Sequence, residues 1–126
     1  MNTTRTTPLP PPPPGTLTAQ RLALEATQIA IAVARTAPPS LRSVAEQLIR
    51  AAASVPANLA EGAGRTGRDR RHHWRIAYGS ALEADTHLRL LAGSTADARV
   101  VEALELLDRV RAMTWRLLHP GPCRCP

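Results

Sequence analysis

Apolar side chains recur every three or four residues through four long segments of the chain, and proline or glycine separates these segments. This spacing places the apolar side chains of each segment along one face of an α-helix. The breaks lie at residues 38–39, at Gly62 and Gly64, and at Gly93. Four helices of about 20 residues joined by short connections are typical of an up-down-up-down bundle. We therefore predict an all-α protein with the fold of an antiparallel four-helix bundle.

The limits of the predicted helices follow from these breaks and from nearby capping residues. The helices are expected at residues 16–36, from about residue 40 to the glycine pair, at residues 66–92 and at residues 95–118. Ser40, or Ser43 with Glu46, is a candidate N-terminal cap of the second helix. Thr66 with Asp69 is the candidate for the third helix. A chain of 126 residues suits a single domain, so the bundle is predicted to span residues 16–119.

The two ends of the chain are expected to lie outside the bundle. Residues 1–15 contain the run PLPPPPPG, which favours a disordered tail with polyproline II character. Residues 120–126 form the second predicted disordered tail, where Cys123 and Cys125 are too few ligands for a tetrahedral metal site. We expect no metal and no cofactor. No apolar run reaches about 20 residues and no signal sequence is recognised, so a cytoplasmic location is expected.

Two helices carry more apolar positions than one core face needs. In the first helix Leu17, Leu24 and Ile31 have heptad spacing, and further apolar residues occupy a neighbouring face. In the fourth helix Val101, Leu106 and Met113 are expected outside the main stripe. A second buried surface is the simplest reason for such a surplus, so we predict a homo-oligomer. The predicted core positions of the third helix are Trp74, Ala77, Tyr78, Ala81, Leu82, Leu88 and Ala92.

The sequence SVPANLAEGAGR combines a proline within a helix, two polar side chains and two glycines. Pro56 removes a backbone hydrogen bond and costs about 3 kcal/mol unless neighbours compensate, which predicts a kink or a compensated turn. Asn58 and Glu61 lie three residues apart and therefore share a helix face. We expect these two residues to satisfy one another together with Ser80 and Glu83, across the junction of the second and third helices.

The same residues also admit an enzymatic interpretation. Glu61 and Glu83 would be a general acid–base pair if a pocket held them together. The sequence shows no nucleophile with an adjacent base, no phosphate-binding glycine loop and no H-E-x-x-H motif. We therefore expect a protein that is not an enzyme.

The chain is basic, with 16 arginines, no lysine and a net charge of +6. Arginine is densest just after the glycine pair. Because Arg68, Arg71 and Arg75 are spaced by three and four, they are predicted to line one exposed stripe that binds phosphate oxygens. With so few aromatic residues, we expect contacts to the phosphate backbone and little stacking on bases. The alternative is a structural or protein-interaction scaffold whose charge only maintains solubility. The predicted nucleic-acid-binding residues are Arg65, Arg68, Arg70, Arg71 and Arg75.

Two runs of sequence resemble a known family. RAAASVPANLAEGAGR, followed by IAYGSALEADTHL, is similar to the four-helix bundle family of the 23S rRNA intervening-sequence proteins, which includes relatives of the accessory variability determinant of diversity-generating retroelements. The resemblance covers residues 17–118. It implies an antiparallel bundle that assembles into a ring-like homopentamer. For the retroelement relatives it also implies a basic surface that binds nucleic acid, whether RNA or DNA, and a reverse transcriptase as partner.

The family signatures can be carried over position by position. Asn58, Glu61 and Gly62 match the N-x-x-E-G signature, which Pro56 precedes and Arg65 follows. Gly79, Ser80 and Glu83 match the second signature, G-S-x-x-E. The chain departs from the family at the run RRHH of residues 70–73, where the family tends to have aromatic and acidic residues, and in its lack of lysine.

Overall fold

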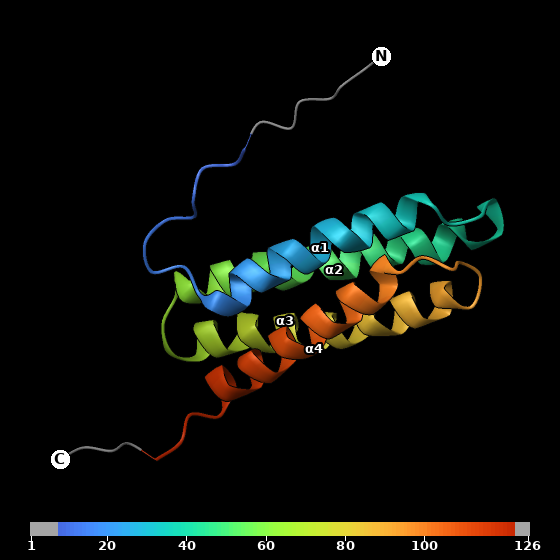
Figure 1. Ribbon diagram of the computed structural model, residues 1–126. Coiled ribbons are helices and arrows are strands. Elements are labelled where there is room, and N and C mark those ends of the chain that lie inside the picture. Colours follow the sequence, from blue (N-terminus) through green and yellow to red (C-terminus); the bar gives the residue numbers. More distant parts are fainter. Residues whose placement is uncertain (1–7, 123–126) are drawn as a thin grey trace.

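The computed structural model describes residues 8–122, and these residues form four α-helices and no strand. Each helix packs against its neighbours in the sequence, and α4 closes the bundle against α1 (Figure 1). The predicted all-α class and four-helix bundle are therefore confirmed. The helices are α1 (Thr18–Arg35), α2 (Arg42–Ala63), α3 (Gly67–Ala92) and α4 (Arg99–Leu118), with a short 3₁₀ turn η1 (Pro39–Leu41) before α2.

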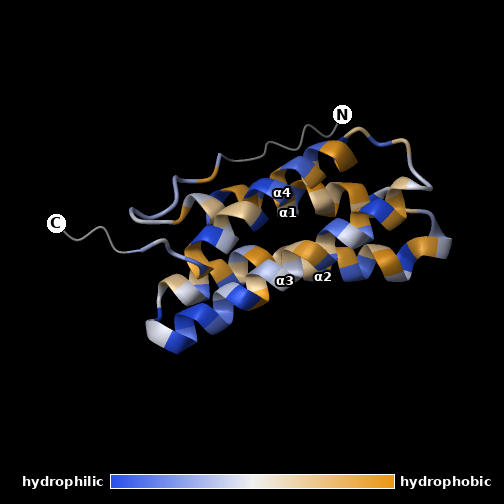
Figure 2. Cartoon of the chain, turned by 90° about the horizontal axis from the view of Figure 1, so that it is seen from below, coloured by the Kyte–Doolittle hydropathy of each residue, from blue (hydrophilic) through white to orange (hydrophobic). Residues whose placement is uncertain are grey.

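The antiparallel order brings the start of α1, the end of α2, the start of α3 and the end of α4 to the same end of the bundle (Figure 1). We call this the α2–α3 end, because residues 64–66 connect those two helices there. The first turns of α3 at this end are strongly hydrophilic, whereas apolar residues follow along the helices (Figure 2). No described helix is both long and apolar enough to cross a membrane.

The helix starts differ from the predicted capping pattern. Helix α2 follows directly from the η1 turn without a side-chain cap, so the predictions for Ser40 and Ser43 were wrong. Thr66 is the N-cap residue of α3 but makes no side-chain hydrogen bond to the backbone. Helix α4 begins four residues later than predicted, at Arg99. There the carboxylate of Asp97 accepts the backbone N–H of Arg99 at 3.0 Å, which holds residues 97–99 in a turn.

The core contribution of α1 comes from alanine rather than from leucine. Leu24, which belongs to the predicted apolar surplus of the first helix, does not contribute to this core, since 45% of its side chain is exposed. A stripe of small side chains faces the bundle instead, which allows the neighbouring helices to approach closely. The sequence analysis considered only the larger apolar residues of this helix, so it did not predict that a stripe of alanines faces the core. The buried residues of α1 are Ala19, Ala23, Ala26, Thr27, Ala30, Val33 and Ala34.

Three further predictions about core positions were wrong, two on α3 and one on α4. On α3, Leu82 and Ala92 are exposed, and Ala84 and Leu91 are buried in the core instead. On α4, Leu106 is buried although it was expected outside the stripe. A shift of one residue rotates a side chain by about 100° around a helix, so small errors in the predicted face exchange buried and exposed positions.

Candidate nucleic-acid interface

Pro56 lies within an unbroken α2, and a side chain from α1 compensates for it. Proline has no N–H, so the carbonyl of Ala52, four residues earlier, lacks its helical donor. The Oγ1 of Thr27 on α1 lies 2.9 Å from this carbonyl oxygen and donates to it. The same hydroxyl is 2.7 Å from the carbonyl of Ala23, so its proton is shared between the two acceptors. The proline is thus tolerated by contact with another helix.

A polar chain crosses from α2 to α3 next to Pro56. The side-chain amide of Asn58 donates to the carbonyl of Ser54 at 2.9 Å and to its hydroxyl at 3.0 Å. The carboxamide oxygen of Asn58 lies 3.0 Å from Nδ1 of His73, which donates to it in the corresponding tautomer. The hydroxyl of Ser80 lies 2.9 Å from the hydroxyl of Ser54. Asn58 and Ser80 are therefore linked, but through Ser54 and not directly.

The predicted network was wrong about its two acidic members. Glu61 is exposed and accepts hydrogen bonds, at 2.7 and 2.9 Å, from Arg65 in the connection that follows α2. Glu83 is also exposed, with Oε1 3.5 Å from Nε2 of His87 on its own helix. Sequence analysis also missed Ser54 and His73. Ser54 was detectable, because it precedes Asn58 by four residues and so shares its helix face.

Gly62 sets the distance between the end of α2 and α3. A Cβ atom at this position would lie 2.5 Å from Cδ1 of Trp74, closer than real atoms approach. The Trp74 indole is buried and its Nε1 donates to the carbonyl of Leu59 at 3.3 Å. The guanidinium of Arg70 lies over the same ring and donates to the carbonyl of Gly62 at 3.1 Å. Arg70 therefore joins the two helices. Gly79, by contrast, has no atom within 4 Å of a built Cβ.

The predicted arginines have different environments at the α2–α3 end. Arg65 pairs with Glu61 and lies 3.6 Å from Asp69, and this guanidinium lowers the pKa of the Glu61 carboxyl through its hydrogen bond and its charge. Arg71 is half-buried and donates to the carbonyl of Leu118 at 2.7 Å, so it binds the end of α4. The prediction of one exposed stripe was therefore wrong for Arg71.

Arg68 and Arg75 remain at the surface. Both side chains are exposed, and we find no hydrogen-bond or ion-pair partner for them among residues 8–122. The structure thus separates the arginines that join helices from those that face solvent.

The family model described as "23S rRNA-intervening sequence protein" matches residues 16–115. The chain belongs to this family. The match includes both signatures and the connection between α2 and α3. No curated protein matches the chain.

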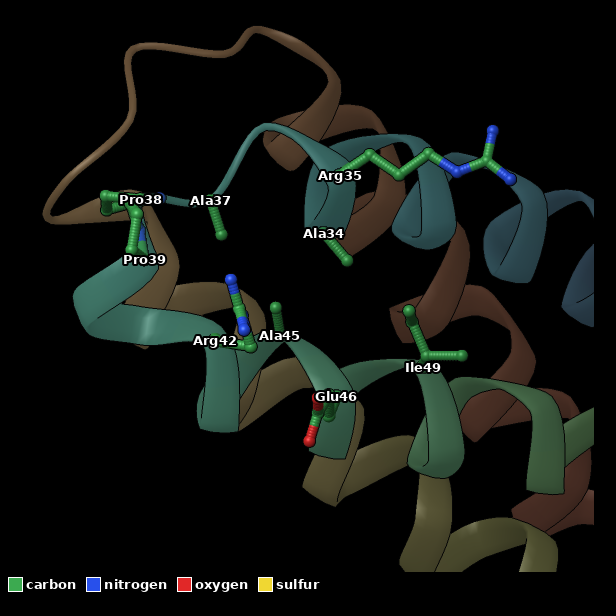
Figure 3. Close-up of a pocket in the computed structure, with 9 residues that line it drawn as sticks. All are labelled: Ala34, Arg35, Ala37, Pro38, Pro39, Arg42, Ala45, Glu46 and Ile49. Atoms are coloured by element: carbon green, nitrogen blue, oxygen red, sulfur yellow. The ribbon is translucent and has the colours of Figure 1, made fainter.

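One cavity of this 23S rRNA-intervening sequence family member lies at the opposite end of the bundle. It measures about 380 Å³ and opens between the end of α1 and the start of α2 (Figure 3). Its walls are mostly alanine, proline and Ile49, with Arg35, Arg42 and Glu46 as the charged residues. None of the signature residues lines it. Within residues 8–122 no cluster of three or more His, Cys, Asp or Glu side chains is arranged for a metal ion, and Cys123 and Cys125 lie outside the described residues.

Proposed function

We propose that this 23S rRNA-intervening sequence family member is a non-enzymatic accessory protein that binds RNA through the phosphate backbone at its α2–α3 end. The observation that carries the proposal is the exposure of Arg68 and Arg75 without partners among the described residues. Exposed guanidinium groups that have no protein partner can form charge-assisted hydrogen bonds with phosphate oxygens. The net charge of +6 adds a long-range attraction for a polyanion.

The family name supports RNA as the nucleic acid, and DNA is the second candidate. The signature residues support the non-enzymatic part of the proposal. Asn58 and Ser80 take part in hydrogen bonds that hold α2 and α3 together. Glu61 pairs with Arg65 in the connection after α2, and Glu83 lies next to His87 on α3. These contacts give the polar residues of both family signatures a structural role in the bundle.

Assembly into a ring-like homopentamer is part of the proposal. Its support is a set of large apolar side chains that the single chain leaves exposed on three helices. Burial of such positions between copies would remove apolar area from water and stabilise an oligomer. In a ring, each copy would repeat the exposed arginines and so multiply the charge offered to one RNA strand. The exposed aliphatic side chains are Leu24, Ile76, Leu82, Leu90 and Val101.

Two further parts of the proposal rest on the resemblance to the accessory variability determinant proteins. A reverse transcriptase is the proposed protein partner, and the cytoplasm is the proposed location. The same exposed apolar side chains also favour a second candidate function, a protein-interaction scaffold without a nucleic-acid role.

The proposal is tested by RNA mobility shift at two salt concentrations, with a variant that combines Arg68→Glu and Arg75→Glu. We expect affinity to fall steeply with salt in the wild type, and the variant to bind all sequences more weakly with a shallower salt dependence. Arg71 is left unchanged because its reversal would also release the end of α4.

The matched control combines Arg42→Glu and Arg50→Glu, which change the net charge equally at exposed positions of α2 away from its C-terminal end. This control should keep most of the wild-type affinity. Equal losses in the two variants would show a non-specific charge effect, and the absence of RNA binding at low salt would favour the scaffold.

A further inference from the structure

The chain has three aromatic residues, and two of them lie side by side near the surface. Trp74 is buried in the core, but 49% of Trp115 on α4 is exposed. The ring of Tyr78 on α3 is half-buried, with its centroid 5.9 Å from that of Trp115. The ring of His119 stacks on Trp115, with centroids 3.7 Å apart and planes inclined by 25°. We call Tyr78, Trp115 and His119 the ring cluster.

The ring cluster is held in place by the backbone around it. Nδ1 of His119 lies 3.0 Å from the carbonyl oxygen of Trp115, and the backbone N–H of His119 donates to the same oxygen at 2.9 Å. The guanidinium of Arg71 binds the neighbouring carbonyl of Leu118 and so fixes the end of α4 against α3. A ligand would therefore meet rings that are already ordered, which reduces the entropy lost on binding.

Arginine surrounds the ring cluster on both helices. Arg111 and Arg116 line, with Tyr78, Ala112 and Trp115, a shallow hollow of about 400 Å³. On α3, Arg71 and Arg75 precede Tyr78 by seven and three residues and so share its helix face. Arg116 is exposed, whereas Arg111 pairs with Asp108 at 2.6 Å. Flat rings flanked by cations are the combination that proteins use to bind single-stranded nucleic acid.

We propose that the ring cluster is a stacking platform for an unpaired RNA base, so that this protein binds single-stranded RNA in preference to duplex RNA. The inference rests on the proposed RNA-binding function and adds the class of RNA to it. A base within a duplex is stacked on both faces and has no free face for Trp115, whereas an unpaired base has one. The platform also replaces the expectation that this protein offers little stacking on bases.

A proline-rich segment is the other ligand that aromatic rings commonly bind, and this chain contains one at residues 8–14. That segment carries no negative charge to match the surrounding arginines. The phosphate backbone of RNA is negatively charged, so charge complementarity with the arginines favours RNA as the occupant.

The experiment compares the binding of a short fluorescein-labelled oligouridylate and of a short RNA duplex at one salt concentration. Trp115→Ala should weaken binding of the single strand by about 5- to 150-fold, which is the effect of losing one stacked base. It should leave duplex binding nearly unchanged. Trp115→Phe keeps an aromatic ring and should therefore keep most of the affinity for the single strand.

Tryptophan fluorescence gives a second readout with unlabelled oligouridylate. Stacking of a base should quench Trp115 in the wild type, whereas Trp115→Phe, in which only the buried Trp74 emits, should show no quenching. Equal wild-type binding of single strand and duplex, with Trp115→Ala unchanged, would overturn the platform and leave the proposed function intact. Failure of the wild type to bind any RNA would overturn both. Quenching by a peptide of residues 1–15 but not by oligouridylate would assign the ring cluster to the proline-rich segment.

Discussion

Replacement of Thr27 by valine tests how the bundle tolerates a proline within α2. Thr27→Val keeps the branched shape of the side chain and removes only the hydroxyl that donates to the carbonyl of Ala52. Ala52 is 1% exposed, so water cannot easily replace the lost donor. The substitution should therefore lower the free energy of unfolding by about 1–3 kcal/mol, the cost of one buried acceptor left unsatisfied.

A matched control separates this effect from the general cost of removing a buried hydroxyl. Thr114 is also fully buried, and its Oγ1 donates at 2.7 Å to the carbonyl of Val110 in the previous turn of its own helix. That carbonyl keeps the regular helical partner, the backbone N–H of residue 114. Thr114→Val should therefore change the free energy of unfolding by less than about 1 kcal/mol.

The measurement is urea unfolding followed by circular dichroism, at one fixed protein concentration because oligomerisation couples to stability. Pro56→Ala restores an N–H opposite the carbonyl of Ala52, so Thr27→Val should cost less in that background. The double-mutant cycle should give a coupling free energy of about 1 kcal/mol or more. Equal losses from Thr27→Val and Thr114→Val, or no coupling with Pro56→Ala, would refute the compensation.

Further tests address the glycines and the glutamate of the family signatures. Gly62→Ala should lower the free energy of unfolding by about 1–3 kcal/mol because the new methyl group would overlap the buried indole. At Gly79 a methyl group would meet open space, so Gly79→Ala should raise the free energy of unfolding by about 0.5–1 kcal/mol through helix propensity. A lower free energy of unfolding in Gly79→Ala would indicate that Gly79 contacts another subunit. Arg65 lowers the pKa of Glu61, so the stabilisation from this pair is present above the unfolded pKa of the carboxyl and disappears as the pH falls through the lower folded pKa. An NMR titration should find the Glu61 midpoint below its ordinary value and closer to it in Arg65→Ala. Glu61→Ala should destabilise less than Thr27→Val, because the exposed pair is screened by water.

The bundle was predictable because the spacing of apolar residues and the positions of proline and glycine are local properties of the sequence. The face of α1 was not, since alanine gives a weak hydrophobic signal and only the packing of neighbouring helices decides that small residues belong inside. The same limit applied to the candidate site. Nothing local distinguishes Arg71, which binds the end of α4, from Arg75, which faces solvent. The role of His73 likewise depends on the distance between α2 and α3, which Gly62 sets.

The alanine face of α1 also determines how the bundle comes apart. Hydrophobic stabilisation is proportional to the apolar area removed from water. Helix α1 buries five alanines, one valine and one threonine, and its larger residues Leu22 and Ile29 are only partly buried against the core. The other helices bury leucines, and α3 buries Trp74 as well. Helix α1 therefore has the smallest hydrophobic resistance to local opening, and its amides should exchange with solvent before those of α2 and α3. A helix that detaches at low cost is also the element that two copies of the chain exchange most readily, so α1 is where domain swapping would begin.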